Sequence, residues 1–70
     1  MGETLRTLRV NLGWTQKDLA EQAKISESAM SQAEKGQSIS VKSAKAIADA
    51  FSSAYGREIK PSDIEGLSVR

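Results

Sequence analysis

The sequence contains no cysteine and no histidine. Disulfide bonds, thiol nucleophiles, zinc sites of the Cys/His type and imidazole acid–base catalysis are therefore excluded. The nine acidic residues are scattered along the chain, and the five glycines form no phosphate-binding loop. We therefore expect a protein that is not an enzyme, with no metal ion, no cofactor and no evident small-molecule ligand.

Long apolar runs are also missing. No stretch approaches the ~20 apolar residues of a membrane-spanning helix, and no signal-peptide pattern is visible at the N-terminus. We expect a cytoplasmic protein with no membrane partner.

The 70 residues are enough for one small domain, which buries only about 60% of its unfolded surface. The net charge of +1 favours a polyanionic partner only weakly.

Two short helices are predicted between residues 15 and 36, because the same start signal occurs twice. Thr15 is a good N-cap, and Asp18 can accept a hydrogen bond from the Thr15 N–H to complete a capping box. Ser26 is the second N-cap, and Gly36 provides a left-handed stop. Only a tight turn around Lys24 fits between the helices. Two short helices joined by so tight a turn are typical of a helix-turn-helix.

The second of these helices, residues 26–35, has an outer face rich in short polar side chains. Ordinary solvent-facing helices favour long Glu and Lys, whereas hydroxyl and amide groups suit the donor and acceptor pattern of DNA base edges. Glu27 at the edge of this face has two open interpretations, because an acid at a helix start also stabilises the helix dipole. The residues at helical spacing on this face are Ser28, Ser31, Gln32 and Lys35.

The run L-R-x-x-L-G-W-T-Q-x-x-L-A-x-x-A-x-I-S-x-S-x-x-S-x-x-E-x-G covers residues 8–36, and a looser match continues through residues 40–51. On these residues the chain resembles the Cro/repressor-type (XRE-like, lambda-repressor-like) helix-turn-helix family. The resemblance implies an all-α fold, a compact bundle of about five short helices that binds double-stranded DNA. Lys24 departs from the family, in which glycine usually occupies this left-handed turn.

Three more helical segments are predicted around the motif. Residues 4–12 carry a leucine stripe, and a helix capped by Ser40 directs Val41 and later apolar residues toward the core. About one helical turn follows Pro61, and residues 68–70 are expected to fray. Tyr55 fits either the core or a dimer face. Residues 1–70 thus form a single DNA-binding domain, with residues 56–70 as a candidate dimerisation segment.

A helix-turn-helix inserts its second helix into the major groove and directs the start of its first helix at the phosphate backbone. Lys42 stands in a first helical turn, where a cation opposes the dipole unless an anion docks nearby. The resemblance implies a structural ion pair between Arg9 and Glu34. The predicted base-reading residues are Glu27, Ser28, Ser31 and Gln32. The predicted phosphate-contacting residues are Thr15, Gln16, Lys35, Gln37, Ser38 and Lys42.

These features predict a sequence-specific transcriptional regulator of the prokaryotic or phage type. We expect a repressor that binds a palindromic operator as a homodimer, because one small module contacts only a few base pairs. An alternative is a protein-interaction module, such as an antitoxin or anti-repressor, that uses the same fold to bind a partner protein. The near-neutral charge and the small number of arginines keep that alternative open.

Overall fold

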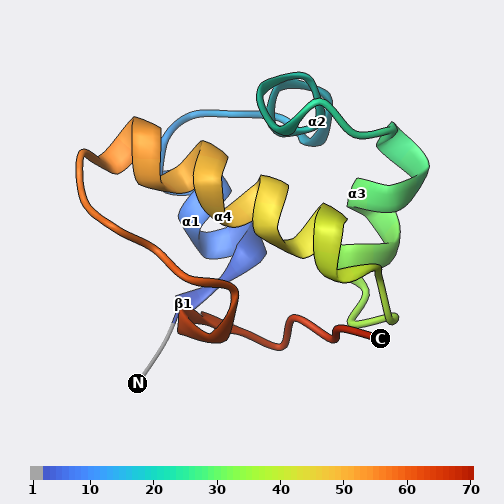
Figure 1. Ribbon diagram of the computed structural model, residues 1–70. Coiled ribbons are helices and arrows are strands. Elements are labelled where there is room, and N and C mark those ends of the chain that lie inside the picture. Colours follow the sequence, from blue (N-terminus) through green and yellow to red (C-terminus); the bar gives the residue numbers. More distant parts are fainter. Residues whose placement is uncertain (1–2) are drawn as a thin grey trace.

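The computed structural model describes residues 3–70. Figure 1 shows the longest helix, α4, at the centre of the fold, with α2 above it, α1 below and behind it, and α3 beside its N-terminal end. The helices are α1 (Leu5–Asn11), α2 (Gln16–Ala23), α3 (Glu27–Glu34) and α4 (Val41–Tyr55), and a 3-10 helix, η1 (Pro61–Asp63), follows. Two short strands, β1 (Glu3–Thr4) and β2 (Ile64–Glu65), pair in parallel.

Each α-helix begins at a hydroxyl side chain that accepts a hydrogen bond from the backbone. The Thr15 hydroxyl accepts from the Asp18 N–H at 3.1 Å, and the Asp18 carboxylate accepts from the Thr15 N–H at 2.9 Å. Both bonds of the predicted capping box are therefore present. Ser26 accepts from the Ala29 N–H, while Thr4 and Ser40 cap α1 and α4 in the same way. These caps satisfy N–H groups that would otherwise have no partner.

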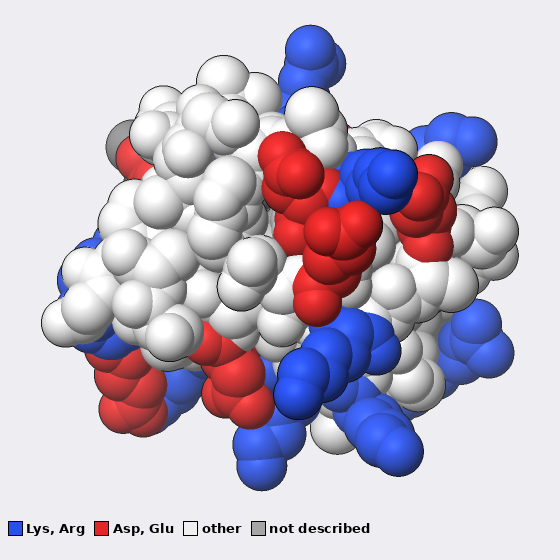
Figure 2. Space-filling model, turned by 90° about the horizontal axis from the view of Figure 1, so that it is seen from above, with Lys and Arg blue, Asp and Glu red and all other residues white. Residues whose placement is uncertain are grey.

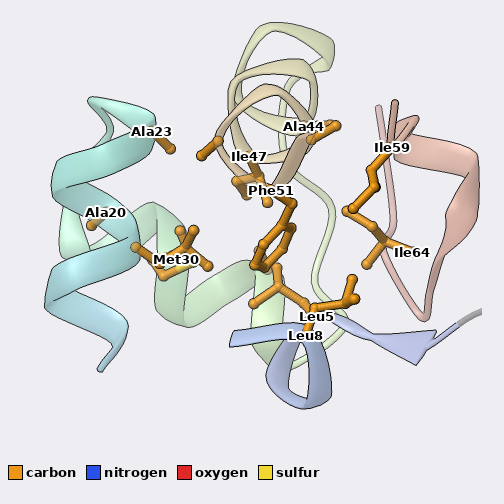
Figure 3. Close-up of a cluster of buried hydrophobic side chains, with 14 of the residues drawn as sticks. Leu5, Leu8, Ala20, Ala23, Met30, Ala44, Ile47, Phe51, Ile59 and Ile64 are labelled. Atoms are coloured by element: carbon orange, nitrogen blue, oxygen red, sulfur yellow. The ribbon is translucent and has the colours of Figure 1, made fainter. Parts of the chain in front are cut away.

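The core lies where α4 meets the other helices. Phe51 is fully buried in its centre, with Ile47 on the same helix and Met30 contributed by α3 (Figure 3). Six of the fifteen buried hydrophobic residues are alanines, at positions 20, 23, 33, 44, 48 and 50. Such small side chains allow helix axes to approach closely, so α2 can pack against both α3 and α4.

The segment after α4 returns to the core and pairs with two distant parts of the chain. Strand β2 aligns Ile64 with Glu3, and a separate bridge aligns Val69 with Ile39. The Ile39 N–H donates to the Ser68 carbonyl at 3.0 Å, and the Arg70 N–H donates to the Ile39 carbonyl at 2.9 Å. The prediction that residues 68–70 fray is therefore wrong. The partner segment lies about thirty residues earlier in the chain, so no local pattern indicated the pairing.

Two further predictions need correction. The described residues contain four α-helices, and the fifth predicted helix is only the short 3-10 turn η1. Val41 was expected in the core, but its side chain is 62% exposed. Ile39, just before the cap, is 2% exposed and occupies the core instead.

Tyr55 is partly buried and packs against the core. Its hydroxyl donates to the Leu8 carbonyl at 2.7 Å, and its ring lies against Phe51 with centroids 6.3 Å apart. The Trp14 ring stacks on Phe51, with ring centroids 6.5 Å apart. No helix within residues 3–70 is long and apolar enough to cross a membrane.

Candidate nucleic-acid interface

Helix α3 is anchored on one side and open on the other. Met30 is fully buried and Ala33 is 3% exposed, which fixes the rotation of the helix about its axis. The opposite side presents three exposed side chains and one that is partly exposed. The exposed ones are Glu27, Ser28 and Gln32, and the partly exposed one is Ser31.

The polar atoms on this outer side are available to an external partner. Among the hydrogen bonds of residues 3–70, none uses the side chain of Glu27, Ser28, Ser31 or Gln32. The sequence predicted these as base-reading residues, and the structure brings all four onto one open surface. This surface, defined by these four residues, is called the α3 face below. Its two hydroxyls, one amide and one carboxylate offer both donors and acceptors.

The start of α2 presents a second set of open polar groups. Gln16 and Lys17 are exposed in the first turn, where backbone N–H groups have no partner within the helix and the dipole is positive. Leu19 is fully buried and holds this turn in place. The Thr15 hydroxyl accepts the cap bond from Asp18 and keeps its own hydrogen to donate. The arrangement suits an anion such as a phosphate.

An ion pair fixes α3 relative to α1 and to the entry of α2. The Arg9 Nε donates to Glu34 Oε2 at 2.8 Å, and Nη2 donates to Oε1 at 3.2 Å. Arg9 Nη1 also donates to the Trp14 carbonyl at 2.7 Å. The two side chains are only 13% and 8% exposed, and the fork-shaped guanidinium matches the carboxylate in bidentate fashion. Three of its five N–H donors are thus used inside the protein.

The turn between α2 and α3 is left-handed at Lys24, with φ 59° and ψ 41°. The Lys24 N–H donates to the Glu21 carbonyl, and the Ile25 N–H donates to the Ala20 carbonyl at 3.0 Å. These two bonds form a Schellman motif, which requires this conformation. Lys24 is the one non-glycine residue with positive φ within residues 3–70. The helix-turn-helix geometry is therefore kept despite the departure from glycine, at a cost of about 1 kcal/mol.

The loop from Gly36 to Ser40 and the start of α4 form the third part of the surface. Lys35, Gln37 and Ser38 are exposed, and so is Lys42 in the first turn of α4. Gly36 ends α3 with φ 80°, and the Gln37 N–H closes the same kind of motif on the Gln32 carbonyl at 3.0 Å. The loop therefore projects directly from the end of the α3 face.

Charge on this molecule is mixed rather than uniformly positive. Figure 2 shows acidic side chains gathered near the middle of the upper face, further acidic side chains near one edge, and basic side chains on several sides of the central group. A hollow of about 450 Å3 lies between α2 and α4, and its lining includes Trp14, Lys24 and Asp49.

No group of acidic side chains that could hold a metal ion occurs within the described part of the chain.

Two basic residues near these surfaces were not among the predicted contacts. Lys17 is exposed in the first turn of α2, where the dipole argument applied to Lys42 holds equally. Arg70 lies in residues 56–70, called the C-terminal segment below, and its guanidinium contacts the Ser38 carbonyl. The N-cap predicted at Thr15 places Lys17 in a first helical turn, so the sequence could have indicated Lys17 as a phosphate contact. Nothing local in the sequence indicated Arg70.

Comparison with known proteins gives one finding. The model of a protein family described as helix-turn-helix matches residues 5–53, which include α1, α2, α3 and most of α4. No curated protein and no solved structure gives a significant match to the chain.

Proposed function

Because the chain belongs to the Cro/repressor-type (XRE-like) helix-turn-helix family, a family of DNA-binding transcription regulators, we propose that it is a sequence-specific repressor that inserts α3 into the major groove. The observation that carries this proposal is the α3 face, whose donors and acceptors are open to solvent and unused by the described part of the protein. A rigid helix with a buried back and an open polar front is the form that fits a groove about 12 Å wide.

Each residue of the α3 face has a base edge that suits its chemistry. The Gln32 amide can donate to adenine N7 and accept from adenine N6 at the same time. The Glu27 carboxylate can accept from cytosine N4, and Ser28 and Ser31 can bond to either kind of edge. A well-placed bidentate pair contributes about 1–3 kcal/mol of discrimination against a wrong base. We expect the preferred site to be recognised through contacts to adenine and cytosine, and not through arginine–guanine contacts.

Phosphate contacts on either side of the groove complete the proposed interface. Thr15, Gln16 and the first-turn N–H groups of α2 face one strand. On the other strand we assign Lys35, Gln37, Ser38 and Lys42, all of which are exposed. These contacts orient the domain without reading sequence.

We propose further that the protein binds as a homodimer on a palindromic operator. A single domain offers one short reading helix, and two copies on half-sites about one helical turn apart would double the contacts. Within the candidate dimerisation segment, residues 56–70, Ile59 and Ile64 are buried in the protein's own core. The exposed residues of that segment, such as Val69 at 43%, are therefore the ones available to a second copy.

A salt titration on selected duplexes tests the proposed function. Selection from a random duplex pool gives the preferred site, and binding is then measured on that site and on a scrambled duplex between 50 and 200 mM salt, a range over which about 6–10 phosphate contacts lower the affinity by ~10³–10⁵. We expect a steep loss of affinity with salt on both duplexes and tighter binding to the selected one. Absence of binding at low salt would contradict the proposal.

A protein-interaction module of the antitoxin or anti-repressor type is the second candidate function. The hollow between α2 and α4 and the mixed charge of the upper face favour it (Figure 2). The same titration separates the two candidates, because a module of this kind would not need to bind duplex DNA at any salt concentration.

A further inference from the structure

The C-terminal segment lies outside the residues that match the family, yet it returns to the proposed DNA-binding surface. Figure 1 shows the red C-terminal segment passing under the fold and ending beside the light green loop that joins α3 to α4. The Ile39 N–H and carbonyl are both bonded to this segment, at 3.0 Å to Ser68 and 2.9 Å to Arg70. Backbone pairing on both sides of Val69 therefore fixes where the Arg70 side chain begins.

The Arg70 guanidinium lies against the same loop. Its Nε and Nη2 both donate to the Ser38 carbonyl, at 3.3 and 3.2 Å. A guanidinium has five N–H donors, so these two bonds leave three. Within residues 3–70 no acidic side chain forms a salt bridge with Arg70, so the remaining donors of the guanidinium are not taken up by a carboxylate side chain.

The loop beside Arg70 has no positive charge of its own. Residues 36–40 are Gly-Gln-Ser-Ile-Ser, and the nearest cations along the chain are Lys35 and Lys42. Gln37 and Ser38 are the residues assigned above to the far phosphate strand. A phosphate that meets this loop would find neutral hydrogen-bond donors from the loop and one guanidinium from the C-terminal segment.

We propose that Arg70 contacts a DNA phosphate beside Gln37 and Ser38, as an additional binding residue supplied by the C-terminal segment. The inference rests on the proposed function. Guanidinium groups bind phosphate oxygens through charge-assisted hydrogen bonds that are stronger than neutral ones. Because the backbone of Arg70 is already ordered by Ile39, less conformational entropy is lost when the side chain binds.

A purely structural role for Arg70 makes a different prediction. If the side chain only holds the C-terminal segment to Ser38, its removal changes stability but not the number of counterions released on binding. The dependence of affinity on salt separates the two roles, because each phosphate neutralised by a cation contributes about 0.9 to the slope of log affinity against log salt.

The experiment compares four variants with the wild type on the selected duplex over a salt series. Arg70→Ala and Arg70→Gln remove the charge, and Gln keeps an N–H donor for Ser38. Arg70→Lys keeps the charge. Arg57→Ala is the matched control, because Arg57 is an exposed arginine over the Tyr55 ring, in the segment at the opposite end of α4 from the loop (Figure 1).

We expect Arg70→Ala and Arg70→Gln to lower the slope by about 0.9 and the affinity at 0.1 M salt by about five- to tenfold on every sequence. Arg70→Lys and Arg57→Ala should keep the wild-type slope. Thermal melting of each variant shows that the fold is intact, and Arg70→Gln keeps the test valid if Arg70→Ala loosens the C-terminal segment.

Two results would overturn the inference while the proposed function stands. One is a wild-type slope for Arg70→Gln together with normal duplex binding. The other is a wild-type slope for Arg70→Ala together with a lowered melting temperature, which would mean that Arg70 only holds the C-terminal segment to Ser38. Failure of the wild type to bind any duplex at low salt is a distinct outcome, and it would remove both the proposed function and this inference.

Discussion

The part of the chain that matches the family and the part that follows it are held in place by different means. Each of the four α-helices begins at a cap whose bonding partner lies three residues away, such as Thr15 with Asp18, and all of these caps except Thr4 of α1 lie within residues 5–53. After residue 53 a local bond of this kind also occurs, from the Lys60 N–H to Asp63, but the bonds that hold the segment to the core join residues far apart in sequence. The bond from the Tyr55 hydroxyl to the Leu8 carbonyl is an example. Helix ends are therefore specified locally, whereas the C-terminal segment is specified by the folded core.

The largest effect is expected for Ile64→Ala, which tests whether the C-terminal segment is part of the core. Ile64 is 3% exposed, so its truncation should lower the free energy of unfolding by about 3 kcal/mol through lost burial and the cavity that remains. Urea denaturation measures the change. Val69→Ala is the control, because Val69 is 43% exposed. Equal destabilisation by the two changes would show that β2 is not part of the core.

Glu34→Ala tests the long-range ion pair between Arg9 and Glu34 that anchors the motif. The change leaves the Arg9 guanidinium, in a side chain only 13% exposed, without its carboxylate. We expect a loss of about 2 kcal/mol in unfolding free energy, more than the intact pair contributes, because a shielded charge remains unpaired. Glu21→Ala removes an exposed carboxylate from α2 and should change stability little. If both variants unfold alike in urea, the pair does not hold α3 in place.

Ala20→Leu tests the close crossing of α2 over its neighbours. Ala20 is 2% exposed, so a larger side chain must displace packed atoms, at a cost of about 1.5 kcal/mol. A lower melting temperature should result. The same substitution at exposed Ala54 in α4 should leave the melting temperature nearly unchanged. An undisturbed melting temperature for Ala20→Leu would contradict the close approach.

The smallest effect concerns two helix ends that share one motif. Gly36 and Lys24 are both left-handed, at φ 80° and φ 59°, but only glycine adopts this conformation without strain. Lys24→Gly should stabilise the protein by about 0.5 kcal/mol, because relief of the strain exceeds the entropy that glycine adds to the unfolded chain. Lys45→Gly in the exposed middle of α4 should instead destabilise it by about 1 kcal/mol. Chemical denaturation of both variants checks the opposite signs.

The same division explains how much could be predicted from the sequence. The capping box at Thr15, the left-handed turn at Lys24 and the stop at Gly36 depend on neighbouring residues, and the structure contains all three. Val41 was misplaced because helical periodicity does not show where a core ends. Ile39 bonds to Ser68 and Arg70 through its backbone, and its side chain is buried in the core, whereas that of Val41 is exposed.

The residues of the candidate site also fall into those that the sequence indicates locally and those that only the fold brings together. The chemistry of the α3 face follows from side-chain type and helical spacing, so the sequence could indicate all four of its residues. Arg70 reaches the loop only because the chain folds back across the whole domain, which no local pattern encodes. The roles assigned to these residues on DNA remain predictions.

The central claim is that the α3 face reads bases, and substitution of Gln32 tests it most directly. Binding of wild type and Gln32→Ala is measured on the selected duplex, on single-base variants of it and on a scrambled duplex. The account predicts a loss of about 1–3 kcal/mol of discrimination at one base-pair position, with binding to the scrambled duplex nearly unchanged. An equal loss of affinity on every duplex would contradict it.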